Sequence, residues 1–285
     1  MQALDLPGWS PHFANSSPLF NSLRHLAKAF EHHQSWPGVA DYQAYLERWP
    51  EQIMTLGGKP LRIVDQAGRP EQFEQHYAPR IYLSGEIQTR LENWHDFFQY
   101  LSWFMFPKTK AVINSIHLPY ARQRIDVGDE LGRRSPMENM LSLFDEGGAV
   151  LVSSDERLLQ DVRDFSWKSL FWHQRARLAT SFDCVPFGHA IYEKGLAPYI
   201  GMTANCILLR ADARYFGMAS VERLAWIDDQ LGPIFEAQQH YQKPRDLQPF
   251  PILGMPAWDK ANVEEAYYDN TAYFRPGRMR DRLKK

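Results

Sequence analysis

His95 and Asp96 are two titratable residues near the start of an aromatic-rich run that spans residues 93–106. Burial among bulky rings shifts the pKa values of such side chains, because their charged forms lose contact with water. An imidazole beside a carboxylate can serve as a general base or as a metal ligand. We therefore predict a catalytic site centred on His95, with Asp96 orienting its ring or acting as a second ligand.

Other histidine and acidic residues would complete this site. His189 and Glu193 stand four residues apart on a predicted helix, so they would share one face, as paired metal ligands do. The spacing matches no defined metal signature, since His-Glu-x-x-His is absent. The predicted catalytic residues are His95, Asp96, His117 and Asp145. The predicted ligands of a divalent metal such as zinc, manganese or iron are His95, His189 and Glu193.

Three side chains close to these residues in the sequence are the candidates for substrate binding. They are Asn93, Lys108 and Lys194. A lysine ammonium group would hold an anionic group of the substrate. The expected partner is therefore a small molecule or an anionic substrate, whose identity the sequence leaves open.

Each candidate residue also has a purely structural interpretation. His95 and Asp96 could belong to a polar helix face, Asp145 to a turn, and His189 to a first helical turn with local hydrogen bonds. On a helical wheel of residues 91–106, the polar arc with His95 also carries Trp103. A large ring is unusual on a purely solvated face, and this favours a site.

A non-catalytic binding module is the alternative function. Arginines cluster at positions 122, 124, 133 and 134, and residues 275–285 contain six basic residues and one acidic residue. Such segments can neutralise the phosphates of a nucleic acid, or they can bind a protein partner. The two hypotheses differ in one respect, because an enzyme gathers its histidine and aspartate residues in a pocket, whereas a scaffold scatters them.

Composition limits the class of protein. The chain has 285 residues, of which 44% are hydrophobic. Its 32 basic and 34 acidic residues nearly balance, which argues against a net positive charge over the whole molecule that would attract a nucleic acid or a membrane. The only cysteines, Cys184 and Cys206, are expected to be reduced and buried. No signal-peptide pattern or long apolar run is present, so we expect a cytoplasmic protein without a membrane partner. Gly-x-Ser-x-Gly and phosphate-binding glycine loops are also missing, which disfavours common serine hydrolases, NTPases and Rossmann dehydrogenases.

Hydrophobic periodicity predicts a helix-rich chain. Helices are expected from residue 17 and over residues 39–54, 91–106, 108–117, 156–165, 167–179, 183–195 and 220–239. Strands are expected at residues 61–64, 81–83 and 206–209, and as a hairpin over residues 141–152. We predict a single α+β domain over residues 1–285, with a small antiparallel sheet and an irregular C-terminal segment at 243–285.

Several unusual peptides recur in order along the chain: Thr89-Arg90, Asn93-Trp-His-Asp-Phe-Phe98, Phe106-Pro-Lys-Thr-Lys-Ala111, Leu143-Phe-Asp-Glu146, Ser153-Ser-Asp155, Trp167-Lys168, Phe187-Gly-His-Ala190, Gly201-Met-Thr-Ala204 and Leu253-Gly254 with Pro256. Together they resemble a bacterial family of uncharacterised proteins, the domain of unknown function 3025. The resemblance covers most of the chain, but it implies no activity and no catalytic residues. From the residues themselves, the leading hypothesis is a cytoplasmic bacterial enzyme, hydrolytic in type.

Overall fold

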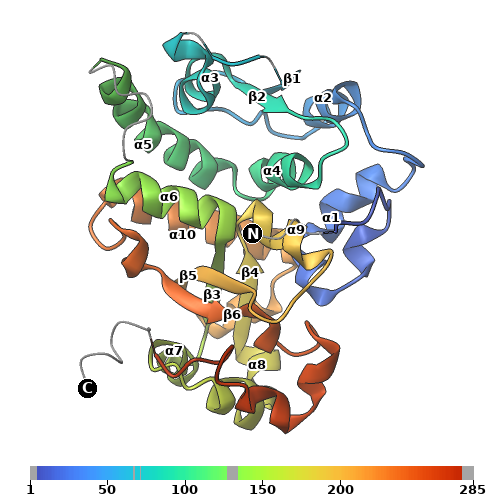
Figure 1. Ribbon diagram of the computed structural model, residues 1–285, viewed down its shortest axis with the longest axis vertical. Helices are drawn as coiled ribbons and strands as arrows, with labels where there is room; N and C mark the ends of the chain where they lie inside the picture. Colours follow the sequence, from blue (N-terminus) through green and yellow to red (C-terminus); the bar gives the residue numbers. More distant parts are fainter. Residues whose placement is uncertain (1–4, 67, 71, 127–133, 278–285) are drawn as a thin grey trace.

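A four-stranded sheet lies at the centre of the computed structural model, which describes residues 5–66, 68–70, 72–126 and 134–277 (Figure 1). The strand order is β4 (Phe182–Pro186), β3 (Gly148–Ser153), β5 (Thr203–Arg210) and β6 (Gln248–Pro251). The β3–β5 pair is parallel, and the two outer pairs are antiparallel. Every residue of β3 is buried, as its continuous apolar sequence requires in a sheet that is covered on both faces.

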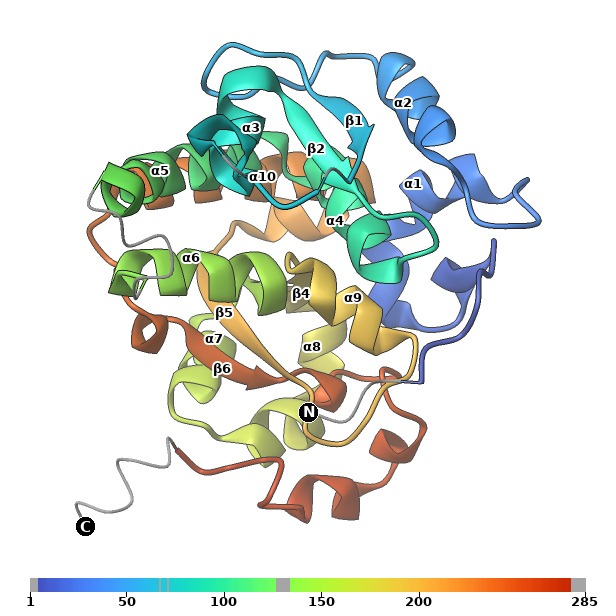
Figure 2. The same ribbon diagram turned by 45° about the horizontal axis from the view of Figure 1, so that its top comes forward.

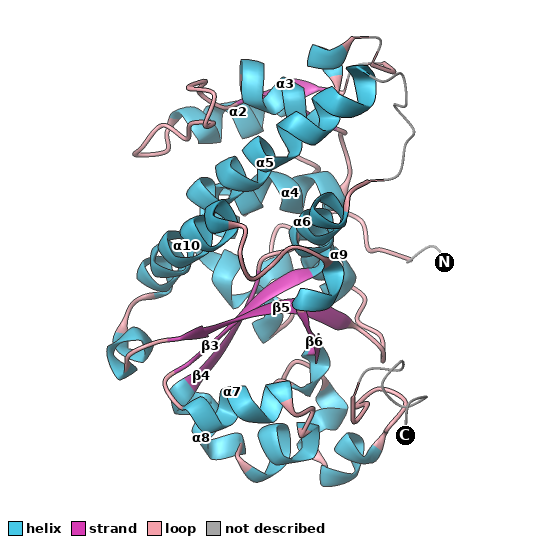
Figure 3. Ribbon diagram, turned by 90° about the vertical axis from the view of Figure 1, so that its left-hand side faces the viewer, coloured by secondary structure: helices cyan, strands magenta, loops and turns pink. Residues whose placement is uncertain are grey.

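Helices cover both faces of this sheet, as Figure 3 shows. One face carries α6 (Pro136–Gly147), α9 (His189–Gly195) and α10 (Ser220–Ala237). The other face carries α7 (Glu156–Arg163), α8 (Arg175–Ser181) and the C-terminal segment of short 3-10 turns. The prediction of a helix-rich α+β fold is confirmed, although the sheet is mixed and includes a parallel pair.

An outer layer lies beyond the helices α4 (Trp94–Met105) and α5 (Pro107–Asp126) (Figures 1 and 2). It consists of a parallel two-stranded sheet, β1 (Arg62–Asp65) and β2 (Glu86–Thr89), with α2 (Val39–Glu47) and α3 (Tyr77–Ser84). The strand β2 contacts α4, and α3 contacts α5. The short helix α1 (Arg24–Ala27) and its neighbouring 3-10 turns complete the N-terminal part.

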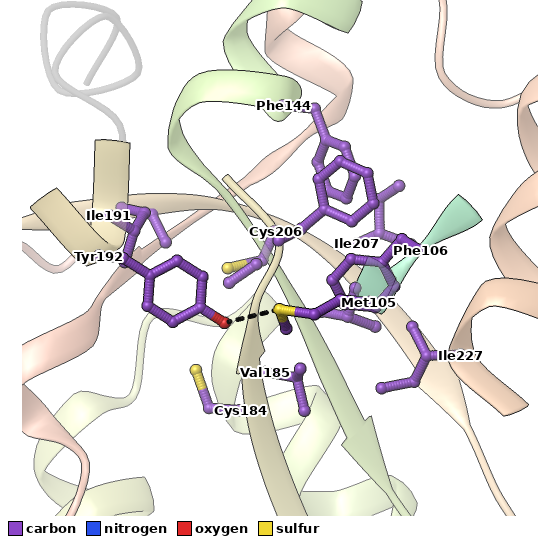
Figure 4. Packing of buried hydrophobic residues seen from close by; sticks show 14 of the residues in the cluster. Met105, Phe106, Phe144, Cys184, Val185, Ile191, Tyr192, Cys206, Ile207 and Ile227 are labelled. Carbon is purple, nitrogen blue, oxygen red and sulfur yellow. Dashed lines mark hydrogen bonds between the residues drawn. The ribbon is translucent and has the colours of Figure 1, made fainter. Parts of the chain in front are cut away.

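The core between the sheet and α4 is rich in aromatic and sulfur-containing side chains. Figure 4 shows Met105 and Phe106 at the end of α4, beside Phe144 of α6. The hydroxyl of Tyr192 donates a hydrogen bond to the Met105 sulfur at 3.9 Å. Cys184 and Cys206 are free and buried, as predicted, and burial raises the pKa values of both thiols.

The predicted hairpin at residues 141–152 is wrong, because residues 136–147 form α6 and only β3 is a strand. A capping box at Ser135 starts this helix. The Ser135 hydroxyl accepts a hydrogen bond from the backbone N–H of Glu138, and the Glu138 carboxylate accepts one from the backbone N–H of Ser135. Apolar residues then recur at helical spacing up to Phe144. Asp145 therefore lies in the last helical turn, not in a β-turn.

Three other local predictions are also wrong. Residues 81–83 belong to α3, not to a strand. The helix predicted over residues 183–195 starts only at His189, because residues 182–186 form β4. The helix α2 ends at Glu47 instead of residue 54. The predicted elements at β1, β5, α5 and α10 are confirmed.

Among the residues that the structure describes, none of the helices combines the length and the apolar character that crossing a membrane would require.

Candidate active site

A cavity of about 720 Å³ separates α4, α5 and α6 from the outer layer formed by α3 and β2. Each helix lines it with one face, as spacings of three and four residues require. The lining side chains of α4 are His95, Asp96, Gln99 and Trp103. Those of α5 are Lys110, Ile113, Asn114, His117, Ala121 and Arg124. Those of α6 are Glu138, Ser142, Asp145 and Glu146, and His189 adds the first residue of α9.

The side chain of Asp96 is held in place by Arg90 and His95. Its Oδ2 accepts hydrogen bonds from the backbone N–H and Nε of Arg90, at 2.8 and 3.0 Å. Its Oδ1 accepts one from Arg90 Nη2 at 2.7 Å and contacts His95 Nδ1 at 3.1 Å. Burial alone would raise the pKa of Asp96, but these hydrogen bonds hold it well below its usual range. The carboxylate is therefore ionised, and Nδ1 of His95 carries a hydrogen that it donates to Asp96.

The ring of His95 also contacts a second imidazole, that of His189. His95 Nε2 lies 3.0 Å from His189 Nε2, and the two rings are nearly perpendicular. His189 is only 2% exposed, and burial lowers its pKa to about 3, so its ring is neutral near pH 7. A contact this short needs one hydrogen between the nitrogens. Either His189 donates it to a neutral His95, or a protonated His95 donates it to His189.

A buried ion pair lies near His189. Lys110 Nζ donates to Asp145 Oδ1 at 2.5 Å, and the two side chains are 3% and 17% exposed. The ammonium group also lies 5.5 Å from the ring centroid of Trp103. Burial would raise the pKa of Asp145, but the charge and hydrogen bond of Lys110, together with the nearby rings of His189 and His117, hold it below the usual value. This pair therefore keeps both charges inside the molecule.

All four predicted catalytic residues line this one cavity, together with His189. His117 lies in the middle of α5, where burial lowers the pKa of its ring. The polar arc of α4 therefore faces the cavity and not bulk water. These residues are therefore gathered at one cavity, and a catalytic role for them stays a prediction.

The predicted substrate-binding residues do not line the cavity. Asn93 caps α4, because its Oδ1 accepts from the backbone N–H of Asp96 at 3.0 Å. Lys108 points elsewhere, since its Nζ pairs with Asp229 at 2.5 Å and its side chain is 69% exposed. Lys194 is in α9 but is not among the residues that line the cavity. A role of these three residues in binding stays a prediction.

The predicted metal site is brought together only in part. His95 and His189 are in contact, but Glu193 lies one turn further along α9 and does not line the cavity. Within the described ranges, no group of three or more His, Cys, Asp or Glu side chains is placed to hold one metal ion. A metal on the two histidines would therefore need ligands from water or substrate, and the metal site stays a prediction.

Sequence reasoning missed several residues of the site, above all Lys110 and Arg90. Lys110 precedes His117 by seven residues, so both lie on one face of α5, and this spacing is a signal that the sequence contains. Arg90 is different, because it acts on Asp96 from the loop before α4. No periodicity marks such a contact.

The arginines of the alternative function are mostly engaged within the fold. Arg124 forms an ion pair with Glu138, and the guanidinium of Arg122 lies 3.8 Å from the ring centroid of Phe73. Arg133 and residues 278–285 lie outside the described residues. Nucleic-acid or protein binding through these segments stays a prediction.

His189 makes the stability of the fold depend on pH. Its pKa is about 3 in the folded chain and 6.5 in the unfolded chain, so only the unfolded chain binds a proton between these values. The free energy of unfolding should therefore fall as the pH decreases from 6.5 toward 3, in total by about 5 kcal/mol for this residue. We expect urea unfolding at pH 7.5, 6.0 and 5.0 to show this loss.

The matched variant for this prediction is His189→Gln. This variant should show a weaker dependence of the free energy of unfolding on pH between pH 6.5 and 5.0, where carboxylates contribute little. His25 and His117, whose pKa values burial also lowers, remain in the variant and leave a residual slope of the same sign. Parallel curves for the wild type and the variant would contradict the prediction.

Comparison with known proteins places the site in a family. Residues 61–278 match the family described as "Protein of unknown function (DUF3025)". The chain belongs to this family. The matched region contains every residue that lines the cavity, from Gln66 to His189, so the whole site lies within the family domain. No curated protein and no solved structure matches the chain.

Proposed function

We propose that the cavity is the active site of a cytoplasmic hydrolase in which His95 acts as general base. The observation that supports this most is the chain of contacts from Asp96 to His95 and from His95 to His189 at the cavity wall. The free cysteines Cys184 and Cys206 fit a reducing compartment.

The Asp96–His95 pair supplies the base. Because Nδ1 of His95 donates to Asp96, the basic nitrogen is Nε2, and 32% of this side chain is accessible. Once the contact with His189 opens, the Nε2 lone pair of His95 takes a proton from water as the water oxygen attacks the substrate, and the imidazolium later returns the proton to the leaving group. Asp96 fixes the tautomer of His95 and stabilises its charged form.

His189 and Lys110 assist in different ways. His189 is kept neutral by burial, and the tautomer with its hydrogen on Nδ1 leaves Nε2 free to accept a hydrogen bond from protonated His95. Lys110 donates only one hydrogen bond to another described residue, Asp145, which leaves ammonium hydrogens for an oxygen that becomes negative in the transition state. Burial strengthens both interactions, because the surroundings screen charge less than water does.

A hydrolysis screen tests the proposal. Wild-type protein, His95→Gln and the exposed control His240→Gln would be assayed with chromogenic esters, anilides and phosphate esters. We expect the wild type and His240→Gln to hydrolyse at least one class, and His95→Gln to be inactive although folded by circular dichroism. Absence of turnover by the wild type in all classes would count against a hydrolase.

Elemental analysis of the wild type and of a His95→Ala, His189→Ala double variant tests the metal prediction separately.

A further inference from the structure

The two outer edges of the central sheet differ in what they offer to a further strand. On β6, the N–H of Ile252 donates to the carbonyl of Met202, and in an antiparallel pair such bonds recur at every second residue. The positions of β6 that point outward are therefore Pro249 and Pro251, which have no N–H to donate. Prolines at these positions keep a further strand from pairing with this edge.

The opposite edge, β4, has no proline before Pro186. Just beyond this strand, the N–H of Phe187 donates to the carbonyl of Gly148. The same alternation therefore leaves the N–H and C=O groups of Phe182 and Cys184 pointing away from β3. No hydrogen bond joins these four groups to another residue in the described part of the chain. This edge thus offers two donors and two acceptors.

The free edge of β4 borders a second cavity, of about 630 Å³, which residues 182–185 all line. Phe182 and Cys184 are each only 5% exposed, so their backbone groups are recessed below the molecular surface. A buried N–H or C=O without a partner costs about as much free energy as a lost hydrogen bond, and roughly nine in ten such groups are paired. Bulk water does not surround these groups, so their partner has to come from the cavity.

An extended peptide in this cavity would satisfy all four groups at once. In strand addition, one residue opposite Phe182 and another opposite Cys184 each exchange two main-chain hydrogen bonds with β4. These two positions are about 7 Å apart, so the paired part of the peptide is about three residues long. The far end of the edge is closed, because the hydroxyl of Tyr192 donates to the carbonyl of Pro186 at 2.8 Å.

The charges around the cavity select the kind of peptide. The charged residues that line it are three arginines and one aspartate: Arg24, Arg175, Arg223 and Asp183. Asp183 already has partners within the fold, since it accepts from the hydroxyl of Tyr215 at 3.1 Å and lies 3.4 Å from Arg223. Arg175 donates to the carbonyl of Asn262 at 3.1 Å, which is an uncharged acceptor. The positive excess therefore favours acidic side chains on the ligand.

We propose that this cavity binds an extended acidic segment of a partner protein, which adds to the free edge of β4 as a fifth strand of the central sheet. Phe182 and Cys184 bind the main chain of the segment. Arg24, which is exposed and lines the cavity, binds an acidic side chain. The inference is independent of the proposed hydrolase, because the two cavities share no lining residue.

The probe is the capped peptide acetyl-Val-Glu-Val-Glu-Val-amide, and its binding to the wild-type protein is measured by calorimetry. One comparison peptide has lysine in place of glutamate. Another has methyl groups on all backbone nitrogens, so it keeps its charges but cannot donate main-chain hydrogen bonds. We expect each of them to bind at least about ten-fold more weakly than the probe, because each loses one kind of contact. Amide hydrogen exchange at Phe182 and Cys184 should become slower when the probe is bound.

Variants of the protein test the same two contacts. Cys184→Pro gives β4 the kind of residue that protects β6, and it should weaken binding of the probe at least about ten-fold. Cys184→Ala removes the thiol but keeps the N–H, and it should bind like the wild type. Arg24→Gln should weaken binding about ten-fold. Arg157→Gln, at an exposed position outside the cavity, is its matched control.

Three results would overturn the inference. The first is no binding of the probe at millimolar concentration. The second is equal binding of the methylated peptide, or displacement of the probe by millimolar inorganic phosphate, since either would show an anion site without strand addition. The third is equal binding of the lysine peptide, which would remove the acidic specificity. If Cys184→Pro does not fold by circular dichroism, the methylated peptide and the hydrogen exchange of the wild type decide.

Discussion

Replacing Asp96 by Asn should lower kcat/KM by about 10³–10⁴-fold, if the hydrolase proposal is correct. The carboxylate accepts from Nδ1 of His95 and so leaves Nε2 as the base. An amide group can turn its NH₂ toward His95, which moves the hydrogen to Nε2 and removes the basic nitrogen from the cavity. The backbone N–H and Nε of Arg90 would keep the other oxygen as acceptor, and only Nη2 would lose its acceptor, so the local structure should persist.

This prediction has a readout that a merely structural role would not change. Nitrogen NMR of the histidine rings reports which ring nitrogen carries the hydrogen. We expect Nδ1–H on His95 in the wild type and Nε2–H in Asp96→Asn. Asp229→Asn, at an exposed ion pair, is the matched control and should change neither the tautomer nor kcat/KM. Activity of Asp96→Asn within ten-fold of the wild type would refute the assigned role.

The local part of the site could be predicted from the sequence. His95 and Asp96 are adjacent, so their proximity needs no tertiary information, and the helical wheel correctly separated their side of α4 from the aromatic core side. What the wheel could not show is that β2 and α3 cover the polar side, which turns a polar face into a cavity wall. The burial that shifts the pKa values therefore comes from the tertiary fold.

The contact between His95 and His189 could not be predicted in the same way. The two residues are 94 positions apart, and their approach depends on α9 packing against α4 and the end of α6. The sequence around Gly147-Gly148 predicts a hairpin turn, which would place Asp145 in a loop. The capping box at Ser135 was the stronger signal, because it satisfies backbone groups that a helix start would otherwise leave unpaired. Long-range packing thus sets the distance between the two imidazole rings, and a competing local signal explains the wrong element predicted around Asp145.

Replacing Lys110 by Met should destabilise the protein by about 3–5 kcal/mol, since it leaves the Asp145 carboxylate without its partner inside the molecule. Lys108 offers an internal control two residues away. Its ammonium group also lies 2.5 Å from an aspartate, Asp229, but the two side chains are 69% and 54% exposed. Lys108→Met should therefore change the free energy of unfolding by less than about 1 kcal/mol. Urea unfolding at pH 7.5 measures both.

A double variant separates the charge from the packing. Lys110→Met with Asp145→Leu removes both charges, and we expect it to regain most of the stability that the single variant loses, because no unpaired charge remains. Equal losses of unfolding free energy in Lys110→Met and Lys108→Met would instead show that water screens the Lys110–Asp145 pair as fully as the exposed Lys108–Asp229 pair. In that case Lys110 would stabilise a developing negative charge no better than a surface lysine does. The same measurement therefore decides how much of the proposed chemistry depends on a cavity that excludes bulk water.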